Sequence, residues 1–475
     1  MKTHLFIDGT WRPAADARTF GVEDPATEQL LARVADGTIE DALAAVAAAD
    51  RALPAWSARS PRERGEILRR AFELMIERRD AIARLIVQEN GKAWRDAVGE
   101  VAYAAEFFRW YAEEAARALG EVSTAPSGTN RILIQLQPVG VSLLVTPWNF
   151  PAAMATRKIG PALAAGCTVV LKPASATPLT AVAIAEVLAD AGVPAGVVNV
   201  VPATRSSAVI SAMLRDSRVR KLSFTGSTEV GRLLLARAAE RVVSCSMELG
   251  GNSPFIVLND ADVDAAVQGS MIAKMRNCGQ ACTAANRFYV QRGIAPTFVT
   301  KLVAAMAALK MGNGLDADVD VGPLVNAEAR DKVQELVEDA VARGARVRLG
   351  GKTPGGTGFF YPPTVLDGVP REARVLNEEI FGPVAPIVEV DDEDDAVRLA
   401  NDTEYGLVSY LYTKDLARGL RLAERLDAGM VGLNRGLVSD PAAPFGGMKQ
   451  SGIGREGGHD GLLEFMEKKY LAVGW

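Results

Sequence analysis

The feature that most constrains the fold is an alternation of short apolar strands and helices that begins near residue 139. The expected strands are 139–146, 168–172, 197–201 and 221–224, and the expected helices between them are 152–165, 177–190 and 206–214. Strands that alternate with helices of about 10–15 residues form βαβ units, whose strands pair in parallel. We therefore expect an α/β protein built on a parallel sheet.

The rest of the chain extends this α/β pattern on both sides. An Asp8-Gly9 turn within 5–11 predicts a short hairpin, and alanine-rich segments follow it. The expected helices there are 39–53, 61–90 and 92–119. A second α/β region starts near residue 250, with strands at 255–258 and 287–291 and a helix at 327–343. With 475 residues, the chain is long enough for two or three domains.

Polar and glycine-containing segments follow three of the predicted strands. They are Trp148-Asn149, 172–175 and 225–227. Ligands bind parallel sheets at the carboxyl ends of their strands, so these segments predict a nucleotide site. The usual dinucleotide fingerprint is absent, because 226–231 keeps only its outer glycines. The segment 350–353 is not a phosphate-binding P-loop either, since Arg346 occupies the position of its first glycine.

Composition and charge exclude several other classes of protein. A net charge of -5 argues against a nucleic-acid partner, which calls for a clustered basic face. The two histidines, His4 and His459, lack the spacing of zinc ligands, as do the four cysteines, so we expect no metal. The amino-terminal residues lack the apolar segment of a signal peptide, and no run of about 18 apolar residues appears. We expect a cytoplasmic protein without a membrane partner.

Three residues carry the chemistry. Cys282 follows Gly279-Gln280-Ala281, Glu248 ends an apolar run just before Leu249 and two glycines, and Asn149 follows the first predicted strand. A thiolate can attack a carbonyl, an amide N–H can stabilise the resulting oxyanion, and a carboxylate can activate water to release the product.

These motifs, in this order, resemble the aldehyde dehydrogenase superfamily over residues 6–470. The resemblance implies a Rossmann-like parallel-sheet cofactor domain, an α/β catalytic domain and a small β-flap that docks on a neighbouring subunit. The corresponding segments are 1–120 with 138–249, 250–445, and 121–137 with 454–475. It further implies a homodimer or homotetramer.

The resemblance also assigns catalytic roles. Cys282 is the expected nucleophile, Glu248 the general base, and Asn149 the oxyanion donor together with the main-chain N–H of Cys282. Hydride leaves a thiohemiacetal to form a thioester, which water then cleaves. Cys278 lies one turn from Cys282 if this segment is helical, and it either packs in the core or has a redox role. Cys167 and Cys245 lie in apolar segments typical of a core.

The expected cofactor is NAD or NADP. Its binding residues are Thr146, Pro147, Trp148, Lys172, Ala174, Ser175, Gly226, Ser227, Leu249, Glu379 and Phe381. Glu379 would accept hydrogen bonds from the nicotinamide ribose, with Phe381 against the ring. In NAD-preferring relatives the position of Ser175 is commonly glutamate, which repels a 2′-phosphate. Serine there, beside Lys172, indicates that NADP is accepted and favours a preference for it.

The expected substrate is a small anionic aldehyde. Arg157, Arg276 and Ser439 match the carboxylate-binding set of the succinate-semialdehyde branch of the family, and the arginine fork suits a carboxylate. Succinate semialdehyde is the first expectation, with glutarate semialdehyde or a phosphonate aldehyde as alternatives. Arg435 departs from the family pattern. A CoA-acylating enzyme would not need Glu248, and a non-catalytic oligomeric binding protein on the same fold would have lost Cys282 or Glu248.

Overall fold

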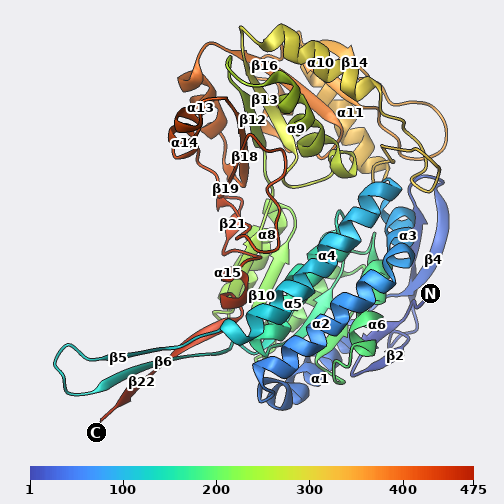
Figure 1. Ribbon diagram of the computed structural model, residues 1–475. Helices are drawn as coiled ribbons and strands as arrows, with labels where there is room; N and C mark the ends of the chain where they lie inside the picture. The colour runs from blue at the N-terminus through green and yellow to red at the C-terminus, as the bar shows by residue number, and fades with distance from the viewer. Residues whose placement is uncertain (475) are drawn as a thin grey trace.

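Two separate β-sheets form the framework of the protein (Figure 1). The structure, a computed structural model, describes residues 1–474. The first sheet has eight strands in the order β2-β1-β9-β8-β7-β10-β11-β21. These strands are β1 (Leu5–Ile7), β2 (Thr10–Arg12), β7 (Val141–Val145), β8 (Thr168–Lys172), β9 (Val198–Val200), β10 (Val219–Thr225), β11 (Ser244–Glu248) and β21 (Gly452–Ile453). The central strands β9, β8, β7, β10 and β11 are all parallel, which confirms the predicted parallel sheet.

Helices cover both faces of the first sheet. They are α1 (Ile39–Ser57), α2 (Pro61–Glu77), α3 (Arg79–Asn90), α4 (Trp94–Glu114), α5 (Pro151–Ala165), α6 (Pro178–Asp190), α7 (Ser206–Arg215) and α8 (Thr228–Ala239), with a 3-10 turn η1 (Ala115–Arg117). One core packs α1 and α7 against the sheet, and a second core packs α5 and α6 against the other face with α2–α4 outside them. The predicted helix 61–90 is in fact two, because Arg78 leaves helical geometry (φ -96°, ψ 13°).

The second sheet has seven strands in the order β14-β15-β16-β13-β12-β18-β19, of which only the β14–β15 pair is antiparallel. Its strands are β12 (Ser253–Val257), β13 (Ala285–Gln291), β14 (Arg346–Leu349), β15 (Thr364–Asp367), β16 (Val384–Val390), β18 (Val408–Tyr412) and β19 (Met430–Leu433). Its helices are α9 (Val263–Met275), α10 (Ala295–Ala307), α11 (Ala327–Ala342), α12 (Arg374–Asn377), α13 (Glu393–Asn401) and α14 (Leu416–Ala423), with a 3-10 turn η2 (Arg276–Gly279).

A third, antiparallel sheet extends away from the body of the molecule in Figure 1. It comprises β5 (Glu121–Thr124), β6 (Arg131–Pro138) and β22 (Met466–Val473), in the order β22-β6-β5. The two segments assigned to the β-flap, 121–137 and 454–475, are therefore joined by pairing between β6 and β22. Trp475, the last residue of the predicted flap segment, lies outside the described residues. The division of the chain into domains at the predicted boundaries stays a prediction.

Short elements complete the fold. They are the hairpin β3 (Thr19–Asp24) and β4 (Gln29–Ala35), the pair β17 (Tyr405–Gly406) and β20 (Met448–Lys449), and α15 (Asp460–Leu463). Within residues 1–474, no helix combines the length and the apolar character that crossing a membrane requires.

Candidate active site

A cavity of about 590 Å³ lies where the carboxyl ends of the first-sheet strands face the second sheet. The first sheet contributes the segments after β7, β10 and β11, and the second contributes Cys282, the start of α11 and residues 379–381. The predicted site residues that line it are Pro147, Trp148, Asn149, Gly226, Ser227, Leu249, Cys282, Glu379 and Phe381. The predicted site thus brings distant parts of the chain to one cavity.

Cys282 lies between η2 and β13, half-buried at the floor of this cavity. The glycine-rich segment after Glu248 passes close to it, since a Cβ atom at Gly251 would lie 2.7 Å from the main-chain oxygen of Cys282. Burial raises the pKa of the Cys282 thiol to about 12, while the positive charges of Arg157 and Arg276 lower it. Both arginines are therefore close enough to influence the nucleophile electrostatically.

The segment before Cys282 does not form a regular helical turn between Cys278 and Cys282. Asn277 (φ 51°) and Cys278 (φ 55°) have left-handed backbone conformations within η2. Asparagine tolerates this conformation because its short polar side chain can hydrogen-bond locally. Cys278 is buried in the core of the second sheet, where burial raises the pKa of its thiol to about 12. This environment fits a packing role, and the redox alternative stays a prediction.

Asn149 lies just before α5, and its side chain reaches the chain segment of the nucleophile. Its Nδ2 atom donates to the main-chain oxygen of Gln280 at 3.2 Å. An amide nitrogen carries two N–H groups, so one fixes the side chain and the other is left for a ligand. The amide is buried beside Cys282 in the same cavity wall. This is the placement that an oxyanion donor needs.

Glu248 ends β11 and is buried beside β10, where it is in register with Thr225. Neither carboxylate oxygen has a hydrogen-bond partner among residues 1–474. Burial raises the pKa of Glu248 well above its ordinary value, and Glu456 raises it further, whereas Lys158 and Arg157 lower it. A carboxylate with a raised pKa is better matched to taking a proton near neutral pH.

Lys158 and Glu456 are buried next to these groups, and sequence reasoning missed both. Lys158 Nζ donates to the Ser223 hydroxyl at 3.0 Å and pairs with Glu456. The adjacent basic residues Arg157 and Lys158 lie inside an otherwise largely apolar helix, α5, and this pattern indicates a buried acidic partner. Glu456 gave no such signal, because its partner lies about three hundred positions away in sequence.

The two predicted substrate arginines differ in how they are held. Arg157 is buried on α5, donates to the Tyr103 hydroxyl at 2.5 Å, and lies 3.6 Å from a Glu456 oxygen. Burial favours a lower pKa for Arg157, but Tyr103, Glu456 and Cys282 together raise it above its usual value, so the guanidinium is charged. Arg276 is half-buried, 5.1 Å from the Phe150 ring centre.

Two further residues bear on the substrate prediction. Ser439 is half-buried in the loop after β19. Arg435, the residue that departs from the family pattern, is exposed, and its Nε donates to the main-chain oxygen of Leu437 at 2.9 Å. Its side chain is therefore held by its own loop.

Comparisons with known proteins agree with this geometry. The sequence profile of the aldehyde dehydrogenase family matches residues 11–471. The chain belongs to the aldehyde dehydrogenase family.

It is 54% identical over 444 residues to a succinate-semialdehyde dehydrogenase of Paenarthrobacter nicotinovorans, covering 94% of this chain and 99% of the relative. It is 50% identical over 475 residues to a glutarate-semialdehyde dehydrogenase of Pseudomonas aeruginosa, covering 100% and 98%. The crystal structure of an NADP-dependent enzyme from E. coli superposes with a TM-score of 0.99, at 48% identity, over 100% of this chain and 98% of that one. The predicted aldehyde dehydrogenase fold is thereby confirmed.

The residues expected to hold the NAD(P) of this aldehyde dehydrogenase lie at two places. Around the cavity, Ser227 caps the start of α8, and Gly226 leaves room for the Phe224 ring, which a Cβ there would approach to 2.4 Å. A helix N-terminus suits a phosphate. Trp148 and Phe381 pack edge to face, 5.5 Å between ring centres. These residues fit a dinucleotide.

Glu379, on the same cavity, accepts a hydrogen bond from the Gly251 N–H at 3.3 Å. Burial raises the pKa of Glu379 to about 7, against the lowering effect of that bond and of Lys332 and Lys274. The predicted adenosine-side residues lie outside this cavity's lining, on β8 and in the segment after it. Lys172 is buried there, and Ala174 and Ser175 are half-buried. Burial lowers the pKa of Lys172 to about 8, opposed by Asp36.

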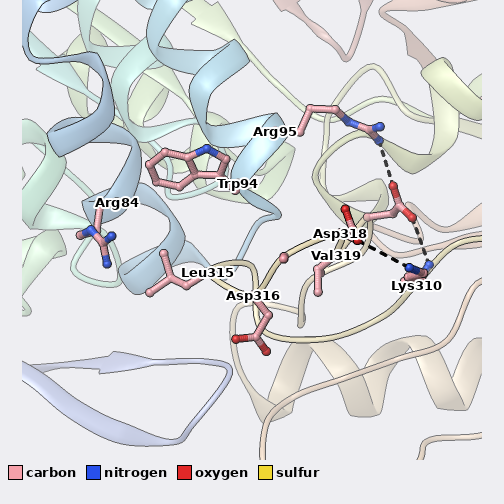
Figure 2. Close-up of a pocket in the computed structure, with 10 residues that line it drawn as sticks. Arg84, Trp94, Arg95, Lys310, Leu315, Asp316, Asp318 and Val319 are labelled. Carbon is pink, nitrogen blue, oxygen red and sulfur yellow. Dashed lines mark hydrogen bonds and ion pairs between the residues drawn. The ribbon is translucent and has the colours of Figure 1, made fainter.

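A second cavity, of about 650 Å³, contains none of the predicted site residues (Figure 2). It lies between α3, the start of α4 and the loop after α10, and four of its charged side chains form two ion pairs. Arg95 lies 3.5 Å from Asp320, and Lys310 lies 3.9 Å from Asp318. We assign no function to it.

The pKa of Cys282 gives a direct prediction for the protein without cofactor. Because burial raises that pKa to about 12, the thiolate fraction should rise about tenfold per pH unit through the neutral and mildly alkaline range. Iodoacetamide labelling of Cys282, followed by peptide mass spectrometry, should show this slope, and Arg157→Met should slow labelling at every pH. The Cys282→Ser variant identifies the background. A labelling rate that levels off near neutral pH would contradict this environment.

Proposed function

We propose that this aldehyde dehydrogenase oxidises succinate semialdehyde to succinate with NADP or NAD. The observation that carries the proposal is the pair of arginines near the nucleophile: Arg157 is buried on α5, and Arg276 donates to the hydroxyl of Thr283, the residue after Cys282, at 3.4 Å. Two cations near the nucleophile suit an aldehyde whose other end is a carboxylate. The relative from Paenarthrobacter nicotinovorans with this activity in its name supports the same substrate.

The first half of the proposed reaction needs a nucleophile and an oxyanion site. The Cys282 thiolate attacks the aldehyde carbon, the C–S bond forms, and the carbonyl oxygen becomes negatively charged. Asn149 Nδ2 and the main-chain N–H of Cys282 donate to that oxygen. The bound nicotinamide supplies the acceptor for the hydride that this carbon then loses. The product on Cys282 is a thioester.

The second half needs a base. Glu248 takes a proton from water, the resulting hydroxide adds to the thioester carbon, and the C–S bond breaks to release a carboxylate and the Cys282 thiolate. Two features of Glu248 support this role: its oxygens have no protein partner among the described residues, and its pKa is raised by burial. A base held by strong hydrogen bonds would be less able to take the proton.

Glutarate semialdehyde is the second candidate substrate. The relative from Pseudomonas aeruginosa with that activity in its name is 50% identical over the whole of this chain. The two substrates differ by one methylene, and one methylene is worth about 1–3 kcal/mol in a fitted pocket. The ratio of kcat/KM for the two semialdehydes in the wild-type enzyme therefore separates the proposals.

We also propose that the enzyme is a cytoplasmic homodimer or homotetramer. The three-stranded sheet of β5, β6 and β22 supports an oligomer, because it extends from the body and exposes apolar side chains such as Val122 and Tyr470. Four free cysteines fit a reducing compartment.

Replacing Glu248 by Gln tests the two-step scheme. Hydride transfer should survive, because the variant retains Cys282 and Asn149, but thioester hydrolysis should slow by about 10²–10⁴-fold. Rapid mixing of enzyme, NADP and succinate semialdehyde should show a burst of NADPH close to one per active site and then very slow turnover. Cys282→Ala should show no burst. Loss of the burst in Glu248→Gln would contradict the assignment.

Replacing the arginines tests the substrate. Arg157→Met and Arg276→Met should each lower kcat/KM for succinate semialdehyde about ten- to a hundredfold relative to butanal, since a hydrogen bond to a charged group is worth about 1.5–3 kcal/mol. The ratio between the two aldehydes is the measured quantity, because Arg157 also affects the Cys282 thiol. The exposed Arg435→Met is the matched control and should leave the ratio unchanged. Equal losses on both aldehydes would make the arginines structural.

Replacing Ser175 by Glu tests the cofactor proposal. A carboxylate beside the 2′-phosphate should weaken NADP by about 1–2 kcal/mol after solvent screening, roughly ten- to thirtyfold in the NADP to NAD efficiency ratio. Ser123→Glu on β5 adds the same charge to the separate three-stranded sheet and should not change the ratio. An unchanged ratio in Ser175→Glu would remove Ser175 from the cofactor site.

A further inference from the structure

A wholly buried ion pair lies behind the proposed oxyanion site. Lys92 Nζ and Glu100 Oε2 are 2.5 Å apart, and both side chains have no exposed surface. Lys92 precedes α4, Glu100 is on it, and the ammonium also lies 4.0 Å from the Phe150 ring centre. Removing two charges from water is costly unless further hydrogen bonds satisfy them, so the remaining partners of this pair are informative.

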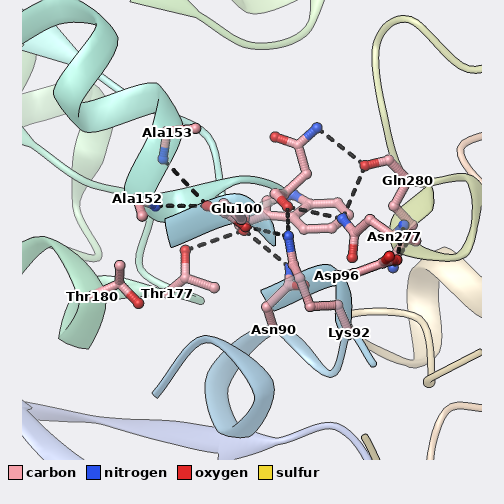
Figure 3. A network of polar contacts seen from close by, with 12 residues as sticks. Asn90, Lys92, Asp96, Glu100, Ala152, Ala153, Thr177, Thr180, Asn277 and Gln280 are labelled. Atoms are coloured by element: carbon pink, nitrogen blue, oxygen red, sulfur yellow. Dashed lines mark hydrogen bonds and ion pairs between the residues drawn. The ribbon is translucent and has the colours of Figure 1, made fainter. Parts of the chain in front are cut away.

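The other hydrogen bonds of Lys92 and Glu100 go to the main chain at Asn149 and just after it (Figure 3). Lys92 Nζ donates to the main-chain oxygen of Asn149 at 2.8 Å. Glu100 Oε1 accepts the N–H groups of Ala152 at 2.8 Å and Ala153 at 3.3 Å, in the first turn of α5. The ion pair therefore holds the backbone at Asn149 and at the start of α5. Asn149 is the residue whose side-chain amide is proposed to bind the oxyanion.

Asn277 connects the same carbonyl to the segment of the nucleophile. Its Nδ2 donates to the main-chain oxygens of Asn149 at 2.8 Å and Gln280 at 3.1 Å. Its own N–H donates to Asp96 Oδ2 at 2.7 Å, one turn before Glu100 on α4. Gln280 is two positions before Cys282, and its oxygen also accepts the Asn149 side chain. The start of α4 thus holds both segments that the oxyanion would contact.

An oxyanion site made from two segments works only if its donors are aligned before the reaction. Displacing a reacting group by about 1 Å can cost about 10²-fold in rate, and losing one oxyanion donor costs about 10²–10³-fold. Asn149 follows β7 of the first sheet, whereas Cys282 precedes β13 of the second. Their relative position therefore depends on contacts between the two segments.

We propose that Lys92, Glu100 and Asn277 are positioning residues that align the Asn149 amide with the main-chain N–H of Cys282. They touch neither substrate nor cofactor in this role. Lys92 and Asn277 act through the main-chain carbonyls of Asn149 and Gln280, and Glu100 acts through Lys92 and the first N–H groups of α5. The inference rests on the proposed function of Asn149 as oxyanion donor.

The test is a double-mutant cycle on the rate of hydride transfer, measured by rapid mixing with NADP. Both succinate semialdehyde and propanal are used, so that the outcome does not depend on the proposed substrate. The variant Lys92→Met/Glu100→Gln removes the ion pair without leaving one charge buried and keeps an oxygen for the α5 N–H groups. It should slow hydride transfer about ten- to a hundredfold, the value of one charge-assisted hydrogen bond, with an unchanged NADP dissociation constant.

In an Asn149→Ala background, the same double variant should slow hydride transfer by less than about threefold, because the side chain that it positions is gone. The matched control is Lys221→Met, which removes another buried lysine, paired with Glu464 at 3.0 Å. This control should leave the hydride-transfer rate unchanged even if it lowers the unfolding temperature.

Asn277→Asp tests the same claim with the ion pair intact. It replaces the shared amide donor by an oxygen that faces two carbonyl oxygens, at nearly constant shape. Hydride transfer should slow about ten- to a hundredfold, and this factor should be at least about fivefold smaller in the Asn149→Ala background, where the positioned side chain is absent.

The outcomes separate the two proposals. If Asn149→Ala alone leaves hydride transfer unchanged, the oxyanion role of Asn149 fails, and the positioning proposal fails with it. If Asn149→Ala slows the step but Lys92→Met/Glu100→Gln slows it by the same factor in both backgrounds, only the positioning proposal fails. Equal slowing by Asn277→Asp in the wild-type and Asn149→Ala backgrounds would also overturn it, because the effect would then not pass through the Asn149 side chain.

Discussion

The whole site depends on how buried charge is compensated where the two sheets meet. Lys92 pairs with Glu100, and Lys158 and Arg157 share Glu456 as their partner. Removing one member of such a pair leaves a buried charge without a partner, which is strongly destabilising. Glu248, in contrast, has no hydrogen-bonded partner within the described chain. Burial raises the pKa of this carboxylate, and Glu456 raises it further. A base that deprotonates water needs such a raised pKa.

Helix α5 connects these buried ion pairs to the proposed site residues. Its first turn is fixed by Glu100, directly after the Asn149 amide. Further along, Arg157 and Lys158 point to the Glu456 side, and Arg157 acts on the Cys282 thiol. One helix thus positions the proposed oxyanion donor, carries Arg157 as a proposed substrate-binding arginine, and contributes the charges near Glu248. A shift of α5 would disturb all three at once.

Local patterns in the sequence predicted most of the framework, because each strand and helix has its own periodicity. The strand at 168–172 was placed with its observed bounds, and the strand-end segments with Asn149 and Gly226 do line one cavity. The condition under which Cys278 would lie one turn from Cys282, a helical segment, is not met, because Asn277 and Cys278 have left-handed backbone conformations. Asn277 is bonded there to Asp96 and Asn149, both distant in sequence. Lys92 and Glu456 could not be predicted either. Their roles come from partners that are distant in sequence, and only the tertiary structure identifies them.

The central claim is that a nucleophile and an oxyanion donor share one cavity, and that two arginines near the nucleophile recognise an anionic aldehyde. The most direct measurement is kcat/KM of the wild-type enzyme for succinate semialdehyde and for butanal, which has the same number of carbons and no carboxylate. With NADP as cofactor, succinate semialdehyde should be favoured by at least about tenfold, the smallest effect expected from one charged hydrogen bond. Equal kcat/KM for the two aldehydes would contradict the account, because the arginines would then not recognise the substrate.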